Sequence, residues 1–329
     1  MQVATDQSLD KFKATLARLS VEHPAGLDVP TIGLAVSGGP DSLALLLLAH
    51  DTFPRGIRVA TVDHRLRVEA AEEASYVARI CRDRGIAHDI LVPDVPISGN
   101  IQSAAREARY GLLHRWANVH RLKWIATAHH ADDQLETILM RIARGSGLPG
   151  LAAIREVNGR VIRPLLGFAK VELVAICQAH NVAPCEDPSN ADLDFDRVQI
   201  RNWLKSAPDL LDARRASRTS AALREAHDAL EWVAEWLEQE RLEVLNNNAL
   251  SLDASGLPRE LQRRLLLRSL QKIDSAVSPR GDTIDRALAT LRRGQKLTVG
   301  DISCMGGSLW RFEPAPPRGT NHQTNRKNR

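Results

Sequence analysis

Up to about residue 145, short apolar runs alternate with longer segments in which apolar positions recur at helical spacing. Short β-branched runs followed by amphipathic stretches are typical of parallel strands joined by crossover helices. The predicted strands are Thr31–Val36, Ile57–Asp63, Ala87–Val92 and Lys123–Ala128, and the predicted helices cover 41–51, 69–85, 102–120 and 131–144. We therefore expect an α/β domain with an open parallel sheet, which binds ligands beyond the carboxyl ends of its strands.

The second half of the chain has a different pattern. It predicts a hairpin around Val157–Val161 and a helix over 169–180, and then a long helical run from about 197 to 245. A smaller unit follows, with a strand at 249–252, helices at 257–272 and 281–293, and a closing strand pair within 297–312. We expect four segments: a catalytic domain over 1–205, a helical linker over 206–248, a small mainly helical α+β domain over 249–317 and a basic disordered tail over 318–329.

Charge divides the long helical run in two. Residues 197–224 hold seven Lys or Arg and two Asp, whereas 225–243 hold seven acidic residues and one Arg. This distribution predicts a partner surface in the first half and a solvated helix face in the second, with Trp232 and Trp236 packing one turn apart. The net charge of +4 comes from four basic residues after position 317, so only local patches can argue for nucleic-acid binding.

Composition narrows the class of protein. With 43% hydrophobic and 26% charged residues among 329, the chain can build a core, which excludes a fully disordered, collagen-like or disulfide-scaffold protein. The longest apolar run, Leu43–Ala49, is far shorter than the roughly 18 residues that cross a bilayer, and no signal peptide is evident. We expect a soluble, cytoplasmic protein without membrane contact. The four cysteines are Cys81, Cys177, Cys185 and Cys304. They form no C-x-x-C pair, so the sequence contains no local motif for a zinc or iron–sulfur site.

The strongest chemical signal is the segment Ser37-Gly38-Gly39-Pro40-Asp41-Ser42, between an apolar strand and a helix. Paired glycines let backbone N–H groups point into one concavity, serine hydroxyls add donors, and the helix N-terminus adds partial positive charge. Pro40 fits the first helical turn. The lysine of a Walker A loop is absent, and Asp41 would repel a bare phosphate, so Asp41 makes best sense as a ligand of Mg²⁺ on a pyrophosphate. An ordinary strand-to-helix turn is the competing interpretation.

This loop resembles the pyrophosphate-binding loop of the N-type ATP pyrophosphatases, the PP-loop superfamily. Further segments narrow the resemblance to the tRNA(Ile)-lysidine synthetase family, in a short form without an extra C-terminal domain: Val62–Arg67, Asn100–Gln102, Ala105–Tyr110, Thr127–Thr137, Arg144–Gly147, Arg163–Leu166 and Glu186–Asn190. The resemblance implies a Rossmann-like catalytic domain of the adenine nucleotide α-hydrolase type. It also implies that the loop residues 37–42, with Val62 and His64 beside the adenine, bind ATP together with Mg²⁺.

The reaction implied by the resemblance joins free L-lysine to an isoleucine tRNA with a CAU anticodon. ATP adenylates the carbon-2 oxygen of the wobble cytidine and releases pyrophosphate. The ε-amine of lysine then attacks carbon 2 and expels AMP, which leaves lysidine and changes codon reading from AUG to AUA. The resemblance also leans towards a homodimer.

Three carboxylates follow the fourth predicted strand. Asp132 and Glu136 lie one turn apart on the predicted helix, and Asp133 points to an adjoining face. Carboxylates at this edge can hold Mg²⁺, bind the ammonium groups of lysine or take its proton, and the sequence leaves these roles open. We expect Asp132 and Asp133 to be catalytic, as Asp41 is, and Glu136 to bind substrate. Helix capping by an Asp is the alternative.

Arginines supply the opposite charge. Arg106 and Arg109 are three residues apart and can face one site, where a fixed guanidinium stabilises the charge that develops on the α-phosphate. We expect Arg106 to be catalytic and Arg109 to bind substrate, with an ordinary surface ion pair as the alternative. Arg197 and Arg201, one turn apart, suit contacts with tRNA phosphates. The basic helices at 197–224 and 257–293 are expected to bind the tRNA body.

Two histidines, His129 and His130, adjoin the acidic residues. Their order does not match the H-x-x-x-H spacing of a zinc site, and magnesium prefers oxygen ligands. We therefore expect both histidines to shape the loop. For Val62 and His64, simple strand termination is the competing interpretation.

Two other functions compete with lysidine formation. A cytidine thiolase of the same superfamily would share the loop, but it needs clustered cysteines for sulfur transfer or an iron–sulfur cluster, and this sequence has none. A non-catalytic RNA-binding protein could keep an ATP site for regulation, but the intact loop together with Asp132 and Asp133 argues against decay of the site.

Overall fold

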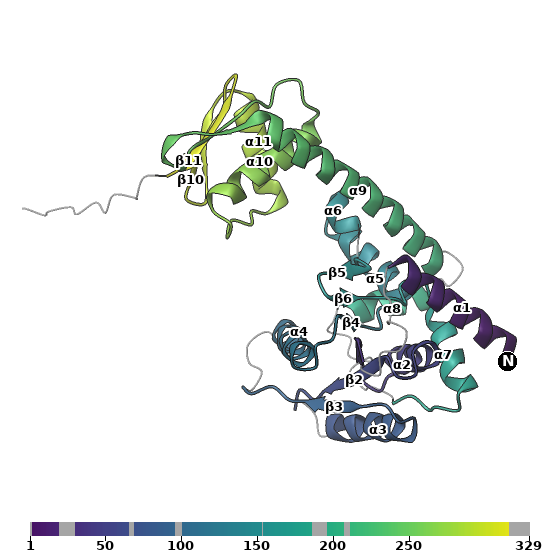
Figure 1. Cartoon of the computed structure of the whole chain (residues 1–329). Helices are drawn as coiled ribbons and strands as arrows, with labels where there is room; N and C mark the ends of the chain where they lie inside the picture. Colours follow the sequence, from purple (N-terminus) through teal and green to yellow (C-terminus); the bar gives the residue numbers. More distant parts are fainter. Residues whose placement is uncertain are drawn as a thin grey trace, which may run out of the picture. The chain divides into compact units, whose positions relative to one another are not determined.

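The computed structural model describes residues 2–19, 30–65, 69–95, 101–152, 154–185, 196–206 and 211–315. The chain divides into two compact units, Met1–Arg224 and Glu225–Arg329 (Figure 1). The boundary falls inside the predicted linker, 206–248. The predicted tail, 318–329, lies outside the described residues.

The first unit is built on a six-stranded sheet. Its strands are β1 (Ile32–Ala35), β2 (Ile57–Val62), β3 (His88–Leu91), β4 (Trp124–Ala126), β5 (Val157–Asn158) and β6 (Val161–Ile162), in the order β3-β2-β1-β4-β6-β5. All neighbours pair in parallel except β5 and β6, which form the predicted hairpin. The predicted parallel sheet is confirmed. The strand order reverses between β1 and β4, and in such sheets the ligand crevice lies at the carboxyl ends of these two strands.

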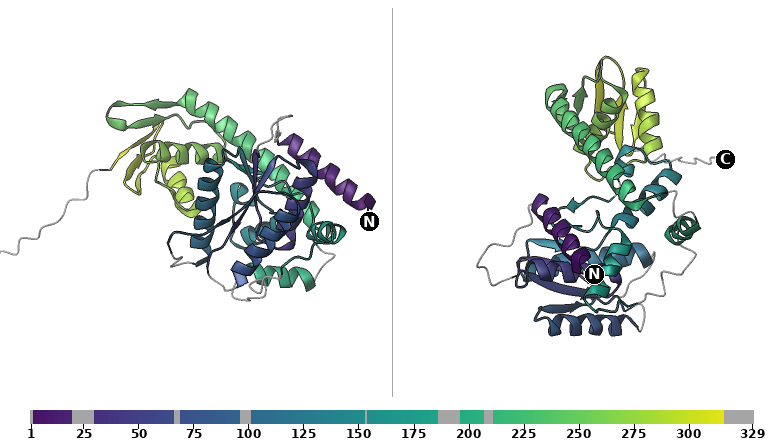
Figure 2. Two further views of the ribbon diagram at one scale, coloured as in Figure 1. Left: turned by 60° about the horizontal axis from the view of Figure 1, so that its bottom comes forward. Right: turned by 90° about the vertical axis from the view of Figure 1, so that its right-hand side faces the viewer.

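Helices cover the sheet because its side chains alternate between two faces (Figure 2). The helices of this unit are α1 (Gln2–Arg18), α2 (Pro40–Thr52), α3 (Glu69–Asp83), α4 (Ile101–Val119), α5 (Ala131–Ala143), α6 (Leu148–Leu151), α7 (Lys170–Ala179) and α8 (Asp196–Ser206). One hydrophobic cluster joins β1 and β2 to α1, α2, α3 and α7, and a second joins the sheet to α4. Every residue from Ser42 to Ala49 is buried in α2, which explains why this run is apolar on all sides.

A close contact between the centre of β1 and α4 fixes the second face. A Cβ atom on Gly33 would lie 2.5 Å from Cζ3 of Trp116 and 2.9 Å from Cδ1 of Leu122. The indole cannot easily withdraw, because its Nε1–H donates a hydrogen bond of 2.8 Å to Asp89. The carboxylate of Asp89 also accepts bonds of 2.6 and 3.0 Å from Arg58 on β2. Only glycine fits this position of the strand.

The second unit begins within a long helix. Helix α9 (Ala213–Arg241) continues into β7 (Leu242–Val244), the short 3-10 turn η2 (Asn246–Asn248) and β8 (Leu250–Leu252), and α10 (Arg259–Ile273) and α11 (Gly281–Arg292) follow. Strands β9 (Lys296–Val299), β10 (Ile302–Met305) and β11 (Trp310–Pro314) complete an antiparallel sheet in the order β7-β8-β11-β10-β9.

Two predictions about these segments are wrong in detail. The helical run 197–245 is two helices, α8 and α9, and the residues between them include Pro208, whose missing N–H disfavours a continuous helix. The closing segment holds three strands instead of a pair, because Gly300 takes a positive φ of 60° and turns the chain between β9 and β10.

The predicted solvated face of 225–243 holds for five of its seven acidic residues, which are exposed, but Glu231 and Glu238 bind basic side chains of α10. Glu238 accepts bonds of 2.5 Å from Arg268 and 2.9 Å from Lys272. Arg264 is only 4% exposed and pairs with Glu231. A buried guanidinium needs such partners, so Glu231 and Glu238 neutralise basic residues of α10 inside the unit. Trp232 and Trp236 remain exposed.

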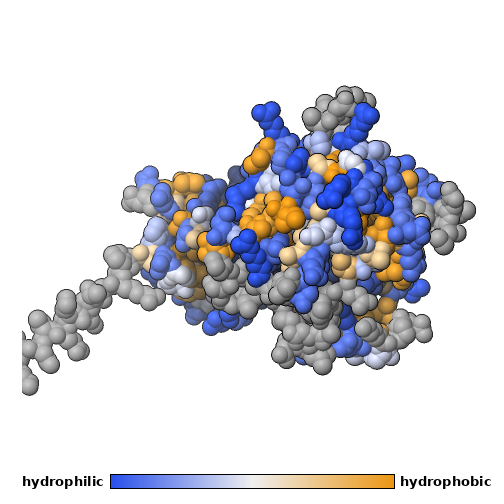
Figure 3. Space-filling view, turned by 90° about the horizontal axis from the view of Figure 1, so that it is seen from below, coloured by the Kyte–Doolittle hydropathy of each residue, from blue (hydrophilic) through white to orange (hydrophobic). Residues whose placement is uncertain are grey.

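Within the described residues, no helix is both long and apolar enough to span a bilayer. On the face drawn in Figure 3, hydrophilic side chains predominate and apolar residues form separate groups.

The contact at Gly33 gives a prediction about stability. Gly33→Ala should destabilise the chain by about 1–3 kcal/mol, because the added methyl overpacks against Trp116. Urea unfolding followed by circular dichroism measures the change. Gly111→Ala is the matched control: Gly111 lies within α4, its nearest neighbouring atom is 3.8 Å away, and alanine there should be neutral or stabilising. Equal midpoints for Gly33→Ala and the wild type would contradict the proposed clash.

Candidate active site

The loop after β1 is folded around one hydroxyl group. Ser42 Oγ accepts hydrogen bonds from the backbone N–H groups of Ser37 (3.1 Å) and Gly38 (3.2 Å), and donates one of 3.0 Å to the carbonyl of Gly39. The Ser42 hydroxyl therefore stabilises the conformation of this loop.

Gly38 and Gly39 give the loop before α2 a shape in which the N-terminus of this helix can bind an anion. Gly38 has a φ of 95°, and its carbonyl accepts a 3.0 Å hydrogen bond from the N–H of Cys185. Gly39 is the N-cap of α2 and offers no side chain to its first N–H groups, and Pro40 follows at the first helical position as predicted. An uncapped helix start with partial positive charge is a suitable phosphate site.

His130 joins this loop to the start of α5. It ends the segment after β4, and its ring lies 3.4 Å from Asp41, 3.3 Å from Asp132 and 3.6 Å from Asp133, measured between nitrogen and carboxylate oxygen. The side chain is buried. Burial opposes the charged imidazolium, but Asp132, Asp41 and Asp133 outweigh it and raise the pKa of His130 to about 10. A cation therefore holds three carboxylates together.

Each of these carboxylates also has a local structural task. Asp133 accepts the N–H of His130 at 3.1 Å, which caps α5, and Asp132 accepts the N–H of Lys170 at 2.8 Å, which ties α5 to the start of α7. Burial raises the pKa of Asp132, but His130 and the Lys170 N–H lower it more, so its pKa lies below the usual range. The capping that competed with a catalytic role is present. It leaves the Asp132 side chain 37% exposed and therefore reachable by a ligand.

Glu136 lies one turn further along α5 and binds Arg201 of α8. The Arg201 Nε and Nη2 groups donate hydrogen bonds of 2.5 and 3.2 Å to the two carboxylate oxygens. Arg201 Nη2 also lies 4.0 Å from Asp133. Glu136 is 3% exposed, so this bidentate pair fixes α8 against α5. Arg197 stands one turn earlier on α8, and its side chain lies outside the described part of the structure.

A group of positive side chains lies near the same edge. The guanidinium carbons of Arg106 and Arg109 lie 5.1 and 5.3 Å from the centre of the Tyr110 ring. Burial, with help from Arg163, Arg109 and Arg106 and against the opposing effect of Asp133, lowers the pKa of His129 to about 3. His129 is thus neutral, and its Nδ1 lies 3.0 Å from Thr127 Oγ1. His129 is therefore influenced both by these arginines and by the carboxylate of Asp133.

The other predicted nucleotide contacts lie at the end of β2. Val62 is the last residue of that strand, and His64 lies two residues beyond it. Burial lowers the pKa of His64, and Arg109 lowers it further, which places His64 close to the arginine group. Sequence reasoning did not select Arg163, although it lies in the segment Arg163–Leu166 that carries part of the resemblance. Arg163 is 5% exposed and donates a 2.7 Å bond to the carbonyl of Arg155.

Comparison of the chain with known proteins identifies its family. The PP-loop domain family matches residues 8–207. The tRNA(Ile)-lysidine synthase of Zymomonas mobilis subsp. mobilis is 41% identical over 297 residues, which cover 87% of this chain and 89% of that protein. The enzyme of the same name from Novosphingobium aromaticivorans is 44% identical over 293 residues, covering 86% and 88%. The chain belongs to the tRNA(Ile)-lysidine synthase family.

A solved structure shares the fold of this family member. The U34-tRNA thiolase of Methanococcus maripaludis, solved with its [4Fe-4S] cluster, superposes with a TM-score of 0.54 at 17% identity, over 68% of this chain and 79% of that one. This likeness shows the fold alone. In this chain Cys81, Cys177 and Cys304 are buried, and no described group of three His, Cys, Asp or Glu side chains is arranged to hold a metal. A thiolase function is therefore less well supported than that of the lysidine synthase family.

The donor set near the loop nevertheless suits magnesium. Asp41 Oδ1 is buried and has no hydrogen-bond partner among the described atoms. Mg²⁺ in nucleotide sites is usually held by one or two carboxylates together with substrate phosphates and water, instead of an all-protein cage. One orphaned carboxylate oxygen at a phosphate-binding helix end fits this pattern.

The neutral His129 gives a prediction about pH. The unfolded chain takes up a proton at His129 as the pH falls below about 6.5, whereas the folded chain does so only near 3. This group therefore stabilises the fold above pH 6.5, and its contribution falls by up to about 1.4 kcal/mol per unit as the pH drops. In urea unfolding at a series of pH values, His129→Asn should lose less stability on acidification than the wild type. His114→Asn, at an exposed position of α4, controls for the loss of a histidine. Parallel curves for His129→Asn and the wild type would refute the neutral state.

Proposed function

We propose that the chain joins free L-lysine to carbon 2 of the wobble cytidine in an isoleucine tRNA with a CAU anticodon, at the expense of ATP. The observation that carries this proposal is the meeting of three parts at the ends of β1 and β4: an uncapped helix start, a carboxylate group and an arginine group. Family membership supports the same reaction. The proposed place of action is the cytoplasm, and the homodimer stays a prediction.

In the first step the carbon-2 oxygen of the cytidine attacks the α-phosphorus of ATP, and pyrophosphate leaves. The backbone N–H groups at the start of α2 bind the leaving phosphates, and Val62 and His64 contact the nucleoside. Arg106 and Arg109, with Arg163 beside them, stabilise the negative charge that develops at the α-phosphate. Mg²⁺, bound by Asp41 and phosphate oxygens, would supply charge neutralisation for the leaving pyrophosphate.

In the second step the ε-amine of lysine attacks carbon 2 and AMP leaves with its bonding electrons. The amine must first lose a proton, because an ammonium group has no lone pair. Asp132 and Asp133 are the proposed binding site for the amine, and one of them accepts this proton. Glu136 and Arg201 hold α8, and with it Arg197, beside these groups for contact with tRNA.

The direct test combines the protein with ATP, Mg²⁺, labelled lysine and a tRNA transcript with the CAU anticodon. Label on the wobble cytidine after nuclease digestion, with one AMP released for each lysine, is the expected result. Asp41→Asn should reduce transfer by at least about 100-fold, while Asp83→Asn, at an exposed position of α3, should not. AMP formation without lysine transfer would show that the adenylation is right and that the acceptor or nucleophile is wrong.

Binding of the tRNA body gives a second prediction. Arg215 and Arg218 on the basic half of α9 are exposed and form no ion pair among the described residues. On α10, by contrast, Arg264 and Arg268 are engaged by acidic residues of α9. We therefore place phosphate contacts at Arg215 and Arg218 and expect their replacement by Ala to weaken tRNA binding and to lower the slope of log K against log salt by about two.

Filter binding over a range of salt concentrations measures that slope. The exposed Arg82 on α3 supplies the control variant Arg82→Ala, which should behave as the wild type does. ATP affinity should be unchanged in all variants. An unchanged slope in the double variant would remove α9 from the tRNA interface.

A further inference from the structure

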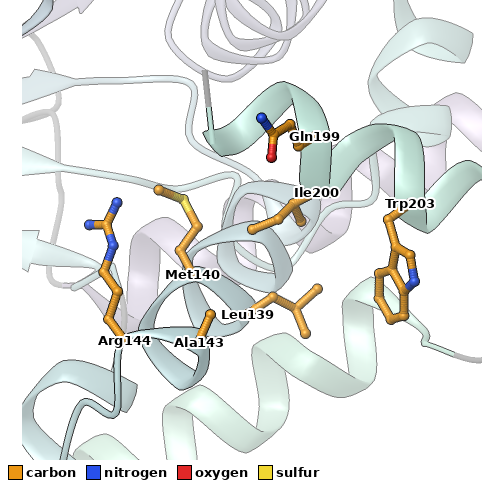
Figure 4. Close-up of a pocket in the computed structure, with 7 residues that line it drawn as sticks. All are labelled: Leu139, Met140, Ala143, Arg144, Gln199, Ile200 and Trp203. Carbon is orange, nitrogen blue, oxygen red and sulfur yellow. The ribbon is translucent and has the colours of Figure 1, made fainter. Parts of the chain in front are cut away.

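A pocket between α5 and α8 lies beyond the proposed catalytic groups. It has a volume of about 500 Å³, a size usual for small-molecule sites. Its lining comes from the last turns of α5 and from α8: Leu139, Met140, Ala143, Arg144, Gln199, Ile200 and Trp203. Figure 4 shows the α5 side chains facing those of α8, with the indole of Trp203 at one end.

The pocket continues the face of α5 that carries the carboxylates. Met140 is one turn beyond Glu136, and Arg144 is one turn beyond Met140, so all three share a side of the helix. From Asp133 to Met140 the helix rises by roughly 10 Å. Glu136 lies between Asp133 and the lining residue Met140 on α5, and it is paired with Arg201, which directly follows the lining residue Ile200 on α8. A ligand in the pocket would therefore lie next to the reacting groups without touching them.

The chemistry of the lining suits a flat, partly polar ring. The interior is apolar, while the indole of Trp203 is 48% exposed and offers an aromatic face. Gln199 carries an amide that can both donate and accept, and Arg144 carries a guanidinium at the rim, as seen in Figure 4. Aromatic stacking combined with a positive rim is the usual means of holding an unpaired base.

Charge around the pocket points to the same class of ligand. Arg141, on the last turn of α5, and Arg144, directly after this helix, are both exposed. A buried apolar peptide would gain nothing from this positive rim, whereas a nucleic-acid backbone would.

We propose that the pocket holds an unpaired nucleobase of the tRNA anticodon loop, adjacent to the base that is modified, stacked on Trp203. The inference rests on the proposed function for the identity of the RNA. It assigns Trp203 as a residue that positions the loop, so that the neighbouring cytidine reaches the carboxylates. The modified base itself does not occupy the pocket, because the adenylation and the lysine attack need the groups before Glu136.

The test measures binding of a fluorescent anticodon stem–loop RNA with the CAU sequence, without ATP or lysine. Trp203→Ala should raise Kd by about 5- to 100-fold, as loss of one stacked base does. Trp203→Phe, which keeps an aromatic face, should recover most of the affinity. Trp232→Ala removes another exposed tryptophan, on α9, and should bind as the wild type does.

A second arm locates the base. Stem–loops with an abasic site at either nucleotide beside the wobble position are compared between the wild type and Trp203→Ala. One abasic RNA should bind both proteins equally, because the stacking partner has already been removed. Equal binding of the intact RNA by both proteins, equal weakening by Phe and Ala, or a difference that persists on both abasic RNAs would each overturn the proposal.

This comparison separates the inference from the function on which it rests. Lysine transfer by the wild type is measured in parallel. Absence of transfer would contradict the proposed reaction, and the Kd series would still decide whether Trp203 stacks on RNA.

Discussion

The active edge of this protein depends on a buried imidazolium surrounded by three carboxylates. Asp41 comes from the loop before α2, and Asp132 and Asp133 come from the start of α5. Without a positive charge between them these groups would repel one another in a region of low dielectric. His130 supplies that charge and thereby joins the phosphate loop to the helix that follows β4. Asp132 extends the connection to α7 through its bond with Lys170.

Two adjacent histidines of one sequence motif have opposite states, and this difference organises the site. His130 is charged because acids surround it, whereas His129 is neutral because it is buried near arginines. The two histidines therefore lie in surroundings of opposite charge, although they are neighbours in the sequence.

The sequence predicted the elements well where the signal is local. The alternation of apolar runs predicted β1 to β4, and Gly39 with Pro40 predicted the start of α2. It failed where the outcome depends on distant partners. Glu238 was predicted to lie on a solvated face with the other acids of 225–243, because nothing local shows that Arg268 and Lys272 lie beside it. His130 was expected only to shape the loop, since its role depends on Asp41, 89 residues earlier in the chain. For Asp133 the sequence left helix capping and a role in the site as alternatives. The structure shows both capping and the contact with the His130 ring, because the same carboxylate takes part in each.

The pairing of α9 with α10 has a consequence for where the second unit can be separated from the first. The strand pairing alone would place the start of the second unit at Leu250, because β8 is the strand that pairs with the distant β11. A chain cut there would lose Glu231 and His227, which contact the buried Arg264, and would also lose Leu237 from the hydrophobic core. A piece that keeps this core and these ion pairs intact therefore starts in the middle of a helix. Any exchange of this unit between relatives, in the laboratory or in evolution, has to carry the C-terminal half of α9 with it.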